Sequence, residues 1–217
     1  MVRLDKAART VEFDAIVPMD CHDPITPIVY LELVCCTPDT REHESLLMTR
    51  ARPSHIHAAL LAAGFESGKP GLVDFRGSKV EGRPPEGAEL RIELRTLGSA
   101  GEEQVETPAD WITPVNGTGP LRALPEGPGV WGARGGWVFA GSRFVSRRDP
   151  ESGAMVEVYD ADGAGQVIGL TTFGSETIAW RQIMSPDTGI SAPVWIARRE
   201  RVPRFGTPVI VRLSPGP

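Results

Sequence analysis

The chain has 217 residues, of which 41% are hydrophobic, so it is long enough to fold around a substantial core. Its 23 basic and 28 acidic residues give a formal net charge of −5 with no long basic run, so we expect no nucleic acid partner. No apolar stretch approaches the roughly 20 residues that span a bilayer, and no export signal opens the chain. The sequence therefore predicts a soluble protein without a membrane span. Its expected location is cytoplasmic for the chain as written, and extracytoplasmic if a signal peptide has been removed.

Short β-type runs separated by turn residues fill most of the chain, and its 24 glycines and 20 prolines are spread between them. Strict alternation of apolar and polar residues predicts half-buried strands over 11–17 and 90–95. A long central strand is predicted over 28–36. Shorter β-type runs lie at 45–49, 72–75, 136–140, 155–159, 166–172, 194–196 and 209–213.

One amphipathic helix is predicted over about residues 53–63. Pro53 suits the first helical position, because the N–H that it lacks would be unpaired there in any residue. Apolar residues then recur at helical spacing, namely Ile56, Ala59, Leu60 and Ala63. No internal repeat or linker divides the chain. We therefore predict a single α+β domain over residues 1–217, with a mostly antiparallel β-sheet and one main α-helix.

Three cysteines are too few for a disulfide framework, and their odd number leaves at least one thiol unpaired. Cys35 and Cys36 are adjacent, so in a strand their side chains point to opposite faces and only one of them could reach Cys21. We expect buried free thiols, with a disulfide at Cys21 as the alternative.

Several segments together resemble the YdjY domain family of bacterial proteins. They are YLELVCCTPDTREHESLLMTRARPSHIHAALLAAGF at 30–65, GGWVFAGSRF at 135–144, YDADGAGQVIGLTTF at 159–173 and ERVPRFGTPVIVRL at 200–213. The similarity covers about residues 10–213. The residues that match recurrent positions of the family are His43, Glu44, Ser45, His57, Trp137, Phe139, Gly141 and Ser142.

This resemblance implies an accessory domain to which no reaction is attached, found alone or beside iron–sulfur and other redox modules, often in exported proteins. The chain departs from that context in two respects. Its three cysteines lack the spacing that holds an iron–sulfur cluster, and it carries no signal peptide.

The candidate site consists of His43, Glu44, Ser45 and His57, which converge if the helix packs back over the strand before it. Such a site would combine two imidazoles, a carboxylate and a hydroxyl. A nucleophilic centre requires a base within hydrogen-bond reach of the serine and a third group that orients the base. In a strand, His43 and Ser45 share one side and Glu44 lies on the other. The alternative is that His43 and His57 make structural hydrogen bonds that tie the helix to the sheet.

A metal site is a second hypothesis, with Cys21, His22, His43 and His57 as candidate ligands for zinc or a similar transition metal. The sequence 160–163, Asp-Ala-Asp-Gly, lacks the further ligands of a calcium loop, so it is interpreted as a hairpin turn.

These observations favour a non-catalytic binding or accessory module that recognises a protein partner or a small ligand. A metal-binding protein that uses histidine and cysteine ligands is the first alternative, and a hydrolase is the second. The sequence identifies no cofactor, no particular ligand and no oligomeric state.

Overall fold

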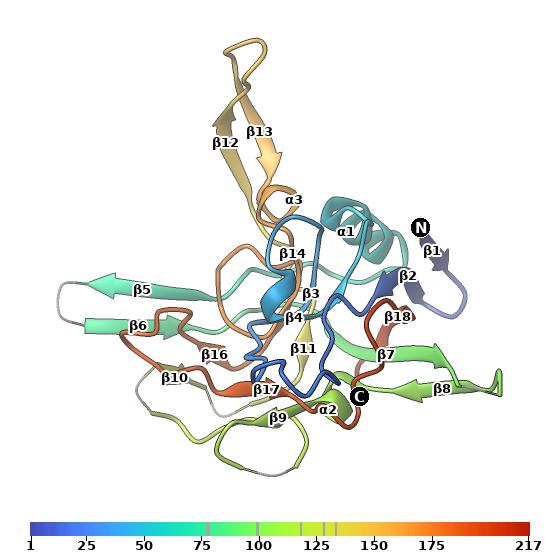
Figure 1. Cartoon of the computed structure of the whole chain (residues 1–217). Coiled ribbons are helices and arrows are strands. Elements are labelled where there is room, and N and C mark those ends of the chain that lie inside the picture. The colour runs from blue at the N-terminus through green and yellow to red at the C-terminus, as the bar shows by residue number, and fades with distance from the viewer. Residues whose placement is uncertain (77–78, 99, 118, 128, 133) are drawn as a thin grey trace.

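The computed structural model describes residues 1–217 except 77–78, 99, 118, 128 and 133, and it is 38% strand and 11% helix (Figure 1). Within the described residues, eight strands close into a barrel. In order around the barrel they are β2 (Thr10–Ile16), β18 (Pro208–Pro215), β7 (Glu89–Leu97), β11 (Trp137–Val138), β15 (Ile178–Trp180), β14 (Gln166–Gly169), β3 (Leu33–Cys36) and β4 (Ser45–Met48).

The remaining described strands extend the barrel sheet or form two-stranded sheets beside it. The extensions are β1 (Val2–Asp5), which pairs with β2, and β8 (Glu103–Glu106), which pairs with β7. The separate pairs are β5 (Leu72–Arg76) with β6 (Lys79–Arg83), β9 (Ile112–Pro114) with β17 (Trp195–Ala197), β10 (Val130–Trp131) with β16 (Ile183–Met184), and β12 (Phe144–Arg148) with β13 (Met155–Tyr159).

The helices are few and short in the described part of the chain. They are α1 (Pro53–Ala62), α2 (Pro108–Trp111), α3 (Asp160–Ala164) and the 3-10 turn η1 (Glu42–Glu44). The predicted helix at about 53–63 is therefore confirmed as α1. The predicted hairpin turn at 160–163 is wrong, because these residues form most of α3. None of the described helices is long and apolar enough to cross a membrane.

The predicted fold class, α+β with a sheet and one main helix, is wrong because the sheet closes on itself as a mostly β barrel. Closure depends on the pairing of β2 with β4, made through Ile16 and Met48. It also depends on two parallel pairs, β3 with β4 and β14 with β15. Alternation within a strand shows which face is buried, but it does not show which distant strand lies alongside.

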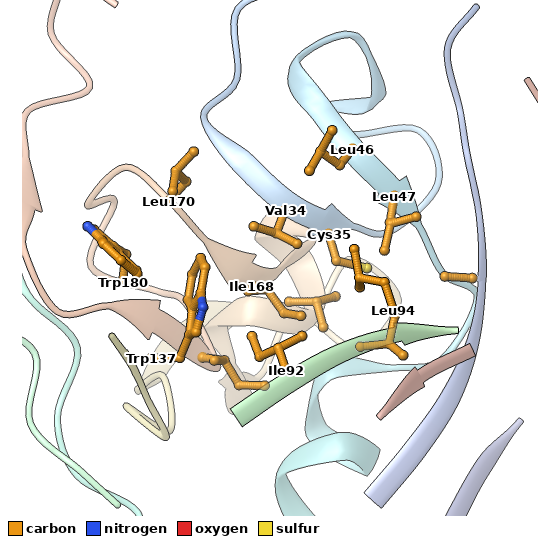
Figure 2. Close-up of a cluster of buried hydrophobic side chains, with 14 of the residues drawn as sticks. Val34, Cys35, Leu46, Leu47, Ile92, Leu94, Trp137, Ile168, Leu170 and Trp180 are labelled. Atoms are coloured by element: carbon orange, nitrogen blue, oxygen red, sulfur yellow. The ribbon is translucent and has the colours of Figure 1, made fainter. Parts of the chain in front are cut away.

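The barrel interior is filled by the apolar faces of its strands, as Figure 2 shows for Ile92 and Leu94 opposite Val34 and Leu47. β7 buries Leu90, Ile92 and Leu94 as the alternation predicted. From α1, Ile56 and Leu60 join the same core and are fully buried. Burial of one such side chain stabilises the fold by about 1.5–3 kcal/mol, so α1 is held mainly by this face.

The strand predicted over 28–36 forms only at its end, as β3. Tyr30 makes an isolated bridge with Ile196 instead. All three cysteines lie in the described part of the chain, and they are free and buried, as predicted.

Candidate functional site

The structure separates the four predicted site residues into two groups. His43 lies in η1, where its side chain is 78% exposed and its Nε2 is 3.8 Å from Glu44 Oε2. Ser45 begins β4, is fully buried and donates a 2.7 Å hydrogen bond from Oγ to the Arg41 carbonyl. His57 lies on α1, and none of its described contacts is with the other three residues.

His57 instead joins a polar cluster that forms where three distant segments meet. Its Nδ1 is 2.9 Å from the Tyr159 hydroxyl, which donates its own proton to the Gly141 carbonyl at 2.9 Å. Thr177 Oγ1 lies 3.2 Å from the same oxygen, so the phenolic hydroxyl is within hydrogen-bond distance of three groups. The name His57 cluster is used below for His57, Phe139, Gly141, Tyr159 and Thr177.

The His57 cluster is neutral near pH 7. Burial lowers the pKa of His57, although the Gly141 carbonyl partly opposes this shift. Burial also raises the pKa of Tyr159. The imidazole packs edge-on against Phe139 and Tyr159, with ring centroids 4.9 Å and 5.3 Å away. These contacts hold the ring by packing as well as by hydrogen bonding.

The backbone at Gly141 brings the cluster together. Gly141 has φ +85°, and a β-carbon there would lie 1.8 Å from Ser67 Oγ and 3.3 Å from His57 Cε1. Only glycine fits this position. The next residue, Ser142, also has a positive φ of 52°, and its Oγ accepts from the Ala161 N–H at 3.2 Å. The segment thus fixes both α1 and α3 to the barrel.

The β12–β13 hairpin is anchored to this cluster at its base. Tyr159 ends β13, and the neighbouring Asp160 is buried and accepts 2.9 Å hydrogen bonds from Arg143 Nε and Arg147 Nη2. The rest of the hairpin projects away from the barrel (Figure 1). Phe144, which pairs with Tyr159 at the base, is 67% exposed, and Met155, which pairs with Arg148 farther out, is 61% exposed.

A second polar group, named the carboxyl cluster below, consists of Glu32, Arg41 and Glu44. The two glutamates directly precede β3 and β4, whose parallel pairing places Leu33 opposite Ser45. Arg41 Nη1 donates to Glu32 Oε2 at 2.9 Å and also to Glu44. Burial raises the pKa of Glu32 to about 7, the Glu44 carboxylate adds to the shift, and Arg41 opposes it.

The segment 173–177 connects the two clusters. At one end the Arg41 guanidinium carbon lies 4.4 Å from the centre of the Phe173 ring, and at the other end Thr177 meets Tyr159. Between them, Glu176 is fully buried and accepts hydrogen bonds from the N–H groups of Phe173 and Gly174. Burial raises the pKa of Glu176 to about 7 although these N–H groups lower it.

The predicted metal ligands have separate neighbours. His22 Nε2 is 2.7 Å from the Val202 carbonyl, and Cys21 is buried, which raises the pKa of its thiol. No three histidine, cysteine, aspartate or glutamate side chains of the described residues gather as metal ligands do.

Sequence reasoning missed Glu32, Arg41, Tyr159 and Glu176. Glu32 lay inside the long strand predicted over 28–36, and Glu176 had no signal in a loop of small polar residues. The sequence offered a signal for a structural role of Tyr159, because this aromatic residue ends a β-type run immediately before Asp160. Aromatic residues are enriched in strands, and the hydroxyl of a buried tyrosine usually finds a hydrogen-bond partner.

These features define a mostly β, barrel-forming domain whose polar groups gather beside strand ends. The YdjY domain model matches residues 2–214, so the chain belongs to the YdjY domain family, which confirms the resemblance. No curated protein and no solved structure matches the chain.

Proposed function

We propose that residues 1–217 act as one non-catalytic binding or accessory module that recognises a partner or a small ligand. The observation that carries this proposal is that the His57 cluster pairs its polar groups with one another. His57 bonds to Tyr159 and Tyr159 to Gly141, so these groups fasten α1 and the β12–β13 hairpin to the barrel. The cluster has the character of a structural brace that holds neighbouring surfaces in place.

The serine of the predicted site supports the same proposal. A nucleophilic hydroxyl needs a base within hydrogen-bond reach and access to substrate. Ser45 is fully buried, and its Oγ donates to the Arg41 carbonyl instead. The serine beside His57 is Ser67, which is exposed and lies close to Gly141. It is therefore the residue with which to test the hydrolase alternative.

The test compares the wild type with His57→Gln and Ser67→Ala on p-nitrophenyl acetate and phenyl phosphate. A positioned base accelerates a reaction by about 10²–10⁴-fold, so its loss is easy to measure. We expect any slow hydrolysis to be the same in all three proteins. Turnover that either substitution abolishes would overturn the proposal in favour of a hydrolase.

The metal alternative is tested by elemental analysis of protein purified without a histidine tag. We expect less than stoichiometric zinc, copper and iron. One tightly held ion per chain, lost in His57→Gln or in a His22→Gln variant, would favour a metal-binding protein instead.

A further inference from the structure

A hollow of about 350 Å³ lies between the β5–β6 hairpin and the segment 173–177. Three of its lining residues are cations, Lys69, Arg83 and Arg143, and one is an acid, Glu86. This excess of positive charge is unusual for a chain whose net charge is −5. The volume is within the range of small-molecule sites, about 300–1,000 Å³.

Two of the cations are available to a ligand. Lys69 and Arg83 are exposed, and neither forms an ion pair with any residue that the structure describes. Lys69 is joined to Glu86 through two backbone hydrogen bonds of 2.9 Å and 3.0 Å, which fix the two chain segments side by side. Glu86 is the one acid among the residues that line the hollow, against three cations.

The third cation, Arg143, is held in position from behind. Its Nε donates to Asp160 Oδ2 at 2.9 Å, and Asp160 is also bound by Arg147. Its Nη1 is directed towards Gly174, because a β-carbon built on that glycine would lie 3.9 Å from it. An arginine oriented in this way loses little freedom when it binds an oxyanion.

The rest of the lining is apolar or backbone. Pro70, Leu72 and Pro84 supply the apolar surface. Gly174 lies next to both kinds of lining, because a β-carbon built on it would be 3.2 Å from Leu72 Cδ2 and 3.9 Å from Arg143 Nη1. A ligand that fits this surface has an oxyanion and a short apolar part next to it. Carboxylate and phosphate groups both have the geometry that arginine and lysine bind.

We propose that this hollow binds a small organic anion, with its carboxylate or phosphate held by Arg143, Lys69 and Arg83 and its apolar part against Pro70, Leu72 and Pro84. The proposal rests on the proposed function, because it treats the domain as a binding module, and it names the ligand class and the place. Glu86 and Glu176 oppose an anion here. The three cations outweigh them because Glu176 is buried and accepts backbone N–H groups.

Calorimetric titration with phenyl phosphate, benzoate and uncharged benzyl alcohol tests the proposal at low and at physiological salt. We expect at least one of the two anions to bind, the alcohol not to bind, and the affinity to fall as salt rises. Binding of the alcohol as tightly as the anions would overturn the proposal. It would also be overturned if neither anion bound with a dissociation constant below about 10 mM, which is weak for a charge-assisted site.

Arg83→Gln and the matched control Arg122→Gln locate the site. Both arginines are exposed and line hollows, but Arg122 belongs to a different one. We expect Arg83→Gln to weaken binding roughly tenfold, as loss of one charge-assisted hydrogen bond does, with no change in the control. Equal affinities in the two variants would place the ligand elsewhere and overturn the proposal.

The same titration separates the two proposals. Hydrolysis of phenyl phosphate that Arg83→Gln reduces would overturn the non-catalytic function while supporting the anion site. Absence of both binding and hydrolysis would overturn the anion site and leave the non-catalytic function in place.

Discussion

The two polar clusters at the ends of the segment 173–177 are built from opposite kinds of chemistry. The carboxyl cluster places two carboxyl groups around the single guanidinium of Arg41. The His57 cluster contains an imidazole, a phenol and a hydroxyl, and it is neutral. Both are partly buried beside the same barrel, so the difference between them lies in charge and not in location.

Burial acts on the two regions with opposite sign because it disfavours whichever form is charged. It raises the pKa of Glu32 and Glu176 to about 7. It lowers the pKa of His57. The raised carboxyl pKa values give stability that is complete below about pH 4.5 and is lost as the pH rises through 7. The lowered His57 pKa gives stability that is complete above about pH 6.5 and is lost as the pH falls.

The largest expected effect is on Glu176, whose replacement by glutamine removes the buried charge. The amide oxygen of Glu176→Gln can still accept the N–H groups of Phe173 and Gly174. A shift of the Glu176 pKa from 4.5 to about 7 means that the wild type loses ~3 kcal/mol of its free energy of unfolding between pH 4.5 and pH 8. Urea unfolding should therefore show the variant to be more stable than the wild type by about that amount at pH 8, and nearly equal to it at pH 4.5.

Glu66→Gln is the control for this experiment, because Glu66 is exposed. We expect it to change the stability by less than about 0.5 kcal/mol at either pH. A Glu176→Gln variant that differs from the wild type by the same amount at both pH values would contradict the proposed titration of Glu176.

A smaller effect is expected from Arg41→Met, which keeps an apolar side chain over Phe173 but removes the cation. Both carboxylates of the carboxyl cluster are then unpaired at pH 8. We expect a loss of about 1–2 kcal/mol, a range that allows for the partial exposure of Arg41. At pH 5 the loss should shrink because Glu32 is protonated. The measurement is urea unfolding at both pH values, with exposed Arg50 as Arg50→Met for the control.

Adding Glu44→Gln to Arg41→Met gives a sharper test of the same cluster. The carboxyl cluster of the double variant keeps one carboxyl group, Glu32, so the repulsion between two carboxylates is gone and most of the loss at pH 8 should be recovered. If it is not recovered, the loss comes from packing over Phe173 and not from charge.

The parts of the fold that the sequence predicted are those set by local pattern. Alternation located β2 and β7, a β-type run located β18, and proline with helical spacing located α1. Barrel closure was missed because it depends on Ile16 pairing with Met48, which no local pattern encodes. The strand at 28–36 was predicted too long, since its early residues are β-type in composition but pair elsewhere.

The candidate site was predictable in the same limited way. His57 was named from its place on the helix, but its partner Tyr159 is 102 residues away in the sequence. Glu44 was named as part of a motif, whereas Glu32 joins it only through the parallel register of β3 and β4. The family resemblance named three members of the His57 cluster, namely His57, Phe139 and Gly141, and one member of the carboxyl cluster, Glu44. The other members join them only through long-range contacts of the fold.

The smallest expected effect concerns the neutral side of the comparison, where His57→Gln removes the ring that packs on Phe139 and Tyr159. We expect a loss of about 1–2 kcal/mol in the free energy of unfolding at pH 7.5, because a partly buried hydrogen bond and two ring contacts are weakened. At pH 5.5 the loss should be smaller, since the wild type must then protonate an imidazole whose pKa burial has lowered, or hold it neutral at a cost. His55→Gln is the matched control, because His55 lies on the same helix and is exposed, and it should change stability by less than about 0.5 kcal/mol. A loss from His57→Gln that grows as the pH falls would mean that the imidazole is stabilised in its charged form, and the contrast between the two clusters would not hold.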